Sequence, residues 1–142
     1  MRAVRLDASG DITPPDLSAT NQAVVWAHPR QGDYLQTPVV VGDLLWGALD
    51  GIITCFDVKT GEIKYSERIG DGSEGFTASP VAAADKLYFT GERGEVFVVP
   101  AKPKFSVSAT NSLGGICLST PAISEGTLFF RTTDRLLAIG PK

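Results

Sequence analysis

The sequence has little of what metal sites and membrane proteins need. It contains two cysteines, Cys55 and Cys117, and one histidine, His28, which are too few for a convincing zinc site. No apolar run approaches the roughly 18 residues of a membrane-spanning helix. The first seven residues contain no apolar segment of the kind found in signal peptides. We therefore expect no metal, no membrane span and no signal peptide in this chain.

Positive charge is also scarce. The net charge is −3 and the isoelectric point is near 5.1. Binding to nucleic acid depends on clustered Lys and Arg that neutralise phosphates. We therefore expect no nucleic-acid partner.

Long helical patterns are missing as well. The 142 residues include 15 glycines and 9 prolines, and these separate short apolar runs. Such punctuation is typical of an all-β protein with many turns. With 43% hydrophobic residues, the chain can still form a core. Both cysteines lie in apolar strand-like segments, so we interpret them as buried free thiols; a disulfide between them is the alternative.

A repeat of about forty residues is what the sequence does contain. Three similar segments begin with Thr37-Pro38, Ser79-Pro80 and Thr120-Pro121, and their prolines are 42 and 41 residues apart. A fixed period of this size indicates repeated supersecondary units.

Each unit reads as antiparallel strands joined by hairpins. In one unit, Gly42-Asp43, Asp50-Gly51 and Val58-Lys59-Thr60-Gly61 are turn signals, and Asp50-Gly51 is the strongest hairpin signal. Ile63 and Tyr65 are expected on one face of its last strand. The strands predicted for this unit are 35–41, 44–49, 52–57 and 62–68. Those of the next unit are 77–83, 86–90, 95–99 and 104–109, and those of the last are 117–124, 127–131 and 135–139. Two further strands are predicted at 3–6 and 23–26, which makes about thirteen in all.

Several inner strands are continuously apolar, such as Val96-Phe97-Val98-Val99. Continuous apolar runs indicate strands that are buried on both faces, as in four-stranded sheets stacked around an axis. The predicted fold is therefore all-β, an incomplete β-propeller of four-stranded antiparallel blades. Residues 1–142 form one partial propeller, with the last two strands of a blade in 1–30, full blades in 34–68 and 76–109, and three strands of a blade in 116–140.

The segment Cys55-Phe56-Asp57-Val58-Lys59-Thr60-Gly61-Glu62-Ile63-Lys64-Tyr65 resembles the repeat A-x-D-x-x-T-G-[KE]-x-x-W of the pyrroloquinoline-quinone (PQQ) repeat propellers. Asp57, Thr60 and Gly61 match, whereas Tyr65 replaces the tryptophan. Val24-Val25-Trp26 is similar to the end of an earlier copy. In a later copy only the aromatic Phe105 is kept, and the last reads Leu136-Leu137-Ala138-Ile139-Gly140. The resemblance covers residues 23–140.

This resemblance implies structural roles for the matching residues. Asp57, Thr60 and Gly61 would fix the turn, and Trp26 and Tyr65 would pack between neighbouring blades. Relatives include bacterial outer-membrane assembly lipoproteins, which favours a periplasmic or secreted location. The quinoprotein dehydrogenases of the superfamily have a cofactor site, a calcium site, an aspartate base and adjacent paired cysteines. This chain has no such cysteine pair, so we expect neither catalysis nor a bound cofactor.

Candidate site residues each have a simpler structural interpretation. His28 has no nucleophile motif nearby and is interpreted as a surface loop residue. The segment 71–75 has carboxylates without the spacing of a calcium loop, and Gly114-Gly115 is followed by no Lys-Ser/Thr, so both are interpreted as loops. Cys117 has no partner that would activate it. Four arginines could line one rim and bind an acidic ligand, or could be solvated surface residues: Arg30, Arg68, Arg93 and Arg131. We assign no catalytic, cofactor or metal residue.

Two questions stay open at the level of sequence. The repeat count predicts an open arc, which fits either a fragment of a longer propeller or a homodimer with enough strands for a ring of six or seven blades. The leading functional hypothesis is a binding scaffold for a protein or ligand, whose partner is another protein or the remaining blades. The alternative is part of a larger quinoprotein-type dehydrogenase or another propeller enzyme.

Overall fold

Four antiparallel β-sheets make up the computed structural model, which describes residues 1–29, 31 and 33–141. No helix occurs among these residues, and hence none that could cross a membrane. Sheet I contains β1 (Arg2–Val4) and β2 (Val24–Ala27). Sheet II contains β3 (Val39–Val41), β4 (Leu44–Leu49), β5 (Ile52–Asp57) and β6 (Ile63–Arg68). Sheet III contains β7 (Val81–Ala83), β8 (Lys86–Thr90), β9 (Glu95–Pro100) and β10 (Ala109–Ser112). Sheet IV contains β11 (Ala122–Ser124), β12 (Thr127–Arg131) and β13 (Leu136–Ile139).

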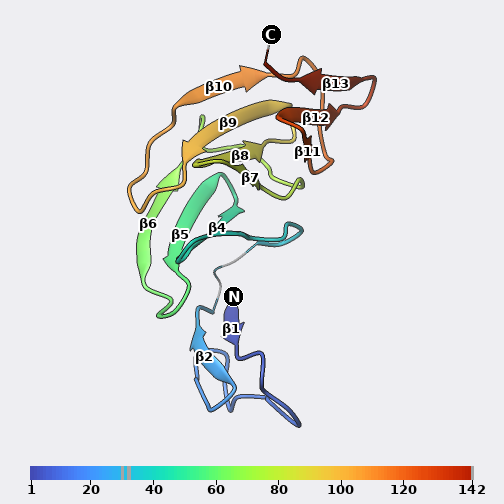
Figure 1. Cartoon of the computed structure of the whole chain (residues 1–142). Helices are drawn as coiled ribbons and strands as arrows, with labels where there is room; N and C mark the ends of the chain where they lie inside the picture. The colour runs from blue at the N-terminus through green and yellow to red at the C-terminus, as the bar shows by residue number, and fades with distance from the viewer. Residues whose placement is uncertain (30, 32, 142) are drawn as a thin grey trace.

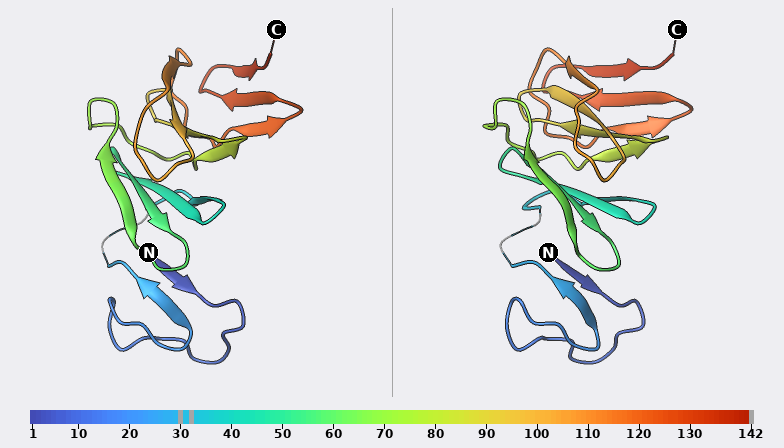
Figure 2. Two further views of the ribbon diagram at one scale, coloured as in Figure 1. Left: turned by 60° about the vertical axis from the view of Figure 1, so that its left-hand side comes forward. Right: turned by 90° about the vertical axis from the view of Figure 1, so that its left-hand side faces the viewer.

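The sheets follow one another along an open arc (Figure 1). Within sheets II, III and IV, each strand pairs with the strand next in sequence. Figure 2 shows that successive sheets lie face to face and that the arc does not close within the described residues. The all-β architecture of stacked antiparallel sheets is as predicted.

The central strands of sheets II, III and IV lie within one residue of their predicted bounds. β4, β5, β8 and β12 have the predicted bounds. At the β4–β5 hairpin both Asp50 and Gly51 have positive φ, of 49° and 73°, as a tight two-residue turn with the right twist requires.

The innermost strands β3, β7 and β11 are shorter than predicted. Each begins directly after the proline of the repeat, at Val39, Val81 and Ala122. Proline has no N–H to donate, so the hydrogen-bonded ladder starts only after it. The residue before the proline contacts the next sheet instead. The Thr37 N–H donates to Ser79 Oγ (2.9 Å), and the Ser79 N–H donates to Thr120 Oγ1 (3.0 Å). The repeated Ser/Thr-Pro pairs thus join successive sheets at their innermost strands.

Two predictions about outer strands are wrong. A bulge in the β5–β6 ladder places Ile63 opposite Phe56 and Tyr65 opposite Cys55, so the two side chains point to opposite faces of sheet II. The last strand of sheet III begins at Ala109 and not at 104, because Phe105 leaves the ladder and packs against Tyr65 of sheet II, with ring centroids 5.5 Å apart.

The turn in the segment that resembles the PQQ repeat is built from the residues that match the repeat. Asp57 Oδ1 accepts the N–H groups of Lys59 (3.0 Å) and Thr60 (2.9 Å), and Thr60 Oγ1 accepts the Glu62 N–H (3.2 Å). Gly61 has φ +73°, and a Cβ there would collide with the Trp26 ring. The motif therefore makes both the turn and the surface on which the aromatic of sheet I packs.

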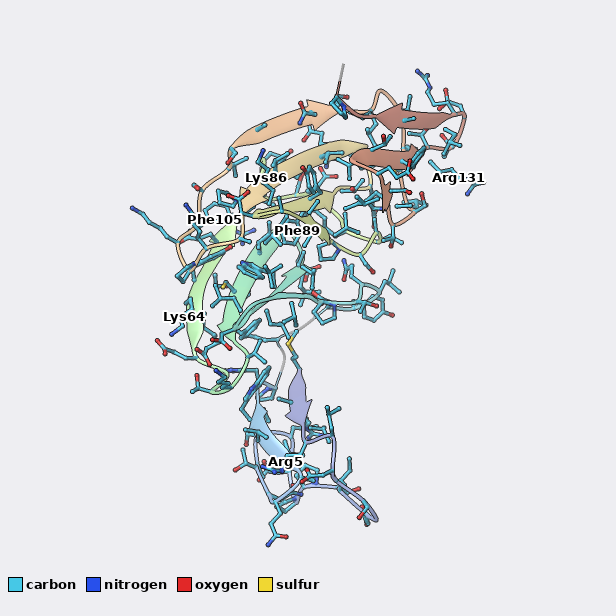
Figure 3. All side chains as sticks on the ribbon, viewed as in Figure 1. Arg5, Lys64, Lys86, Phe89, Phe105 and Arg131 are labelled. Atoms are coloured by element: carbon cyan, nitrogen blue, oxygen red, sulfur yellow. The ribbon has the colours of Figure 1, made fainter. Side chains whose placement is uncertain are left out.

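The core consists of the contacts between sheets. A cluster between sheets II and III includes the buried Trp46, Phe76, Phe89 and Phe97. A second cluster between sheets III and IV contains Val96, Leu113, Cys117 and Phe130 as its buried members. Labelled side chains in Figure 3 show Phe89 between sheets II and III, and Phe105 on the outer side of the arc beside β6. Aromatic burial is thus concentrated between sheets II and III.

Candidate functional site

The loops that follow β4, β6, β8, β10 and β12 meet at one end of the sheets, which we call the hairpin face. It consists of the hairpins 50–51, 91–94 and 132–135 and of the connections 69–80 and 113–121. Adjacent loops are joined through the backbone: the Glu92 N–H donates to Gly75 O (2.9 Å), and the Thr133 N–H donates to Ile116 O (2.9 Å). This face carries most of the charged residues that the sequence suggested.

The described arginines of the predicted rim lie at this face but do not form one site. Arg93 pairs with Asp71 (3.2 Å) and donates to Ser73 Oγ (2.9 Å), and Arg68 donates to Gly72 O (3.2 Å). Arg131 lies at the end of β12, at the far side of the arc from Phe105 (Figure 3). Arg30 lies outside the described residues. Two of the three described arginines are therefore occupied by the 71–73 loop.

The acidic segment 71–75 is a structured connection between sheets II and III. Asp71 Oδ1 accepts the N–H (2.9 Å) and the hydroxyl (2.7 Å) of Ser73. These hydrogen bonds, together with Arg93, lower the pKa of Asp71 to about 2. Glu74 is buried against Gly91 and accepts the Arg93 N–H (3.2 Å). The described residues contain no group of three acidic, His or Cys side chains arranged to hold a metal ion.

His28 is not the surface residue that the sequence suggested. Its side chain is half-buried against the rings of Trp26 and Phe56, at centroid distances of 5.6 and 5.4 Å. One ring nitrogen lies 2.6 Å from Gly61 O. His28 is therefore part of the contact between sheets I and II, a role that its position next to a proline did not reveal.

Both cysteines are free thiols and fully buried, as the sequence predicts. Burial raises the pKa of Cys55 to about 11. Cys117 lies between sheets III and IV, with its sulfur 3.3 Å from Arg131 O. A reactive cysteine combines a low pKa with access to solvent. Both thiols are buried, so neither has the access to solvent that a reactive cysteine needs.

Asp33 is a half-buried acid that sequence analysis did not identify. Its Oδ1 accepts the Ala48 N–H (2.6 Å), and its Oδ2 is buried without a partner among the described residues. Burial raises the pKa of Asp33 to about 6. Asp33 lies against Gly47 as Glu74 lies against Gly91. The 41-residue spacing between the two acids was the available signal, because it is the period of the repeat.

The outward face of sheet IV is exposed. Strand pairing identifies equivalent positions in the three sheets. The pair Arg131–Leu136 of sheet IV corresponds to Ala48–Ile53 in sheet II and to Thr90–Val96 in sheet III. Ile53 is 0% exposed and Val96 is 3% exposed, but Leu136 is 70% exposed. On this face of sheet IV lie Phe129, Arg131, Leu136 and Ala138, which we call the open face. The open face consists of the positions whose equivalents in sheets II and III pack against the next sheet.

Comparison with known proteins supports this architecture and supplies no function. No family model and no curated protein sequence matches the chain. Among solved structures, the chain is similar to BamB from Moraxella catarrhalis, a β-propeller protein, with a TM-score of 0.68 at 17% identity. The chain is an incomplete β-propeller. The match covers 83% of this chain and 37% of BamB, so the chain spans little more than a third of that structure. A computationally designed protein, Ika4, matches with a TM-score of 0.45 at 8% identity.

Proposed function

We propose that this chain is a non-catalytic PQQ-like propeller module that acts as a binding scaffold, and that it binds through the open face of sheet IV. The observation that carries the proposal is the exposure of Leu136 at a position where the equivalent Ile53 and Val96 are buried. An exposed apolar sheet face of this kind favours contact with another sheet. The partner is a further β-sheet, from additional blades, a second copy or another protein.

The chemistry of the motif supports membership of the PQQ-like repeats. Asp57, Thr60 and Gly61 make the turn, and Trp26 packs on it with its Nε1–H donated to Val58 O (2.8 Å). These are the roles that the resemblance implies. BamB, the similar structure, adds support for a propeller scaffold through its fold alone.

The open edge of β13 gives the scaffold a second means of contact. Sheets II and III each have a fourth strand, β6 or β10, beside β5 or β9, whereas β13 is the last strand of sheet IV among the described residues. Its outer backbone groups can therefore accept an added strand. Arg131 lies where sheets II and III have Ala48 and Thr90, and this charge would select a partner with an acid or an amide at that point.

Light scattering after size-exclusion chromatography tests the open face. We expect the chain to associate as its concentration rises, and Leu136→Lys to remain monomeric because a buried lysine would be unpaired at the contact. Lys104→Glu, in an exposed loop away from the open face, is the matched control and should associate like the unmodified chain. A Leu136→Lys variant that associates as well as the unmodified chain would contradict the proposal, and a chain that stays monomeric at all concentrations would exclude a second copy as the partner.

A separate assay tests the non-catalytic assignment. The chain is incubated with PQQ and Ca²⁺ and examined for quinone absorbance and dye-linked alcohol oxidation. We expect neither signal above a protein-free control. Oxidation that depends on the chain would instead favour the dehydrogenase alternative.

A further inference from the structure

The two interfaces between complete sheets can be compared position by position, because strand pairing defines equivalent rows. In sheet II, Trp46 pairs with Cys55 and Cys55 with Tyr65. In sheet III, the same row reads Tyr88, Val98 and Ala109. Ala109 therefore occupies the position of Tyr65.

Between sheets II and III, the ring of Tyr65 fills the outer part of the interface. Tyr65 is 9% exposed, and its hydroxyl accepts the Trp46 Nε1–H at 2.7 Å. The ring also contacts Phe105, which comes from the loop after β9. The interface between sheets II and III thus contains a phenol ring whose hydroxyl is hydrogen-bonded to the neighbouring Trp46.

Between sheets III and IV, the position of Tyr65 is occupied by Ala109, which has no ring. Ala109 is exposed, and a cavity of about 450 Å³ opens between the sheets beside Asn111, the next residue on the same face of β10. The volume lies within the range of small-molecule sites, roughly 300–1,000 Å³. Its apolar walls are formed by Val96, Leu113, Leu128, Phe130 and Ile139, and its polar groups come from Tyr88, Asn111 and Ser112.

We propose that this cavity binds a small neutral phenol next to the position that corresponds to Tyr65 in the interface between sheets II and III. The apolar walls suit an aromatic ring, since a cavity lined by Leu, Ile and Phe takes up benzene-like molecules. Tyr88 lies at the position of Trp46, which contacts the phenol oxygen of Tyr65, so a polar partner is available for the ligand hydroxyl.

The lining also excludes charged ligands. Among the residues that the structure describes, no Asp, Glu, Lys, Arg or His contributes to the cavity. A carboxylate or ammonium group would lose its hydration there without an ion pair, which disfavours its binding. This inference is independent of the proposed scaffold function, because the cavity lies on the inner side of sheet IV and the open face lies on its outer side.

The test uses p-cresol, the side chain of tyrosine as a free molecule. Its dissociation constant is measured by ligand-observed NMR titration of the whole chain, with benzoate as the charged analogue. We expect saturable binding of p-cresol and at least about tenfold weaker binding of benzoate, a difference of about 1.4 kcal/mol. Failure of p-cresol to bind, or equal binding of benzoate, would overturn the proposal without use of any variant.

A pair of variants on β10 locates the site. Ala109→Tyr supplies the missing ring from within the chain and should weaken p-cresol binding at least about tenfold. Thr110→Tyr adds the same side chain at the next residue, which points to the opposite face of the strand, and should leave binding unchanged. Equal binding to Ala109→Tyr and to the unmodified chain would place the ligand elsewhere and refute the site. N-acetyl-tyrosine amide represents a tyrosine within a polypeptide. If it bound more tightly than p-cresol, the ligand would be a tyrosine side chain of a protein, and the proposal of a free phenol would be wrong.

Discussion

At the scale of single residues, Trp26 holds sheet I against sheet II. The side chain is 6% exposed, stacks on Phe56 at a centroid distance of 6.1 Å and donates to Val58 O. Truncation to alanine would leave a cavity between the sheets and an unpaired carbonyl. We expect Trp26→Ala to lower the free energy of unfolding by about 3–5 kcal/mol in a urea titration followed by circular dichroism.

The control for this prediction is on the same strand. Val25→Ala changes a residue that is 47% exposed on the other face of β2 and should cost far less. Trp26→Phe keeps a ring and loses the hydrogen bond, so we expect an intermediate effect. A loss below about 1 kcal/mol for Trp26→Ala would contradict its role between the sheets.

Asp33 gives a residue-scale prediction of pH dependence. Its pKa in the folded chain, about 6, lies above the ordinary value of an aspartate because the side chain is partly buried. The folded state therefore binds more protons than the unfolded state between about pH 4 and pH 6, and this group makes stability fall as the pH rises through that range. Asp33→Asn removes the titration. We expect the stability of Asp33→Asn relative to the unmodified chain to increase from pH 4 to pH 7 in parallel urea titrations.

The difference between the two proteins isolates Asp33 from other acids. Asp71 and Asp134 have pKa values lowered to about 2 by hydrogen bonds and neighbouring arginines, so they reduce stability as the pH falls. That effect is common to both proteins and cancels. A relative stability that stays constant from pH 4 to pH 7 would show that Asp33 titrates normally.

At the scale of elements, the hydroxyl of each Ser/Thr-Pro pair should protect the amide of the equivalent residue in the preceding sheet. Ser79→Ala removes the acceptor of the Thr37 N–H, and Thr120→Ala removes the acceptor of the Ser79 N–H. In hydrogen-exchange NMR, we expect Ser79→Ala to speed exchange at Thr37 and Thr120→Ala to speed exchange at Ser79. Ser79→Thr keeps the hydroxyl and should preserve protection. Faster exchange at both amides in both variants would indicate general loosening instead.

Elements were predictable from the sequence where local chemistry decides them. Asp50-Gly51 fixes the β4–β5 hairpin, and the bounds of β4 and β5 follow from it. Strand ends that depend on distant contacts were not predictable. Phe105 leaves the ladder for a ring forty residues away in the sequence, and the bulge at Ile63 moves Tyr65 into the interface. The candidate site was the least predictable part. The surroundings of Asp33 and His28 and the cavity between sheets III and IV are set by contacts between segments that are distant in the sequence.

At the scale of the whole molecule, the interface between sheets II and III and the interface between sheets III and IV differ in their packing. Their buried cysteines report on them separately, since Cys55 lies between sheets II and III and Cys117 between sheets III and IV. Both side chains are 0% exposed, so alkylation requires local opening. Stacked repeats open first where the contact with a neighbour is weakest. The interface of Cys55 buries several aromatic rings, whereas that of Cys117 contains the cavity.

We therefore expect iodoacetamide to label Cys117 faster than Cys55 under native conditions, as measured by peptide mass spectrometry. Both sites are in one molecule, so differences in concentration and global stability cancel. Ala109→Tyr should slow labelling at Cys117 and leave Cys55 unchanged, because the added ring would pack between sheets III and IV, next to the cavity. Equal rates at the two cysteines would mean that the sheets open only together, and faster labelling of Cys55 would reverse the assigned order of interface strength.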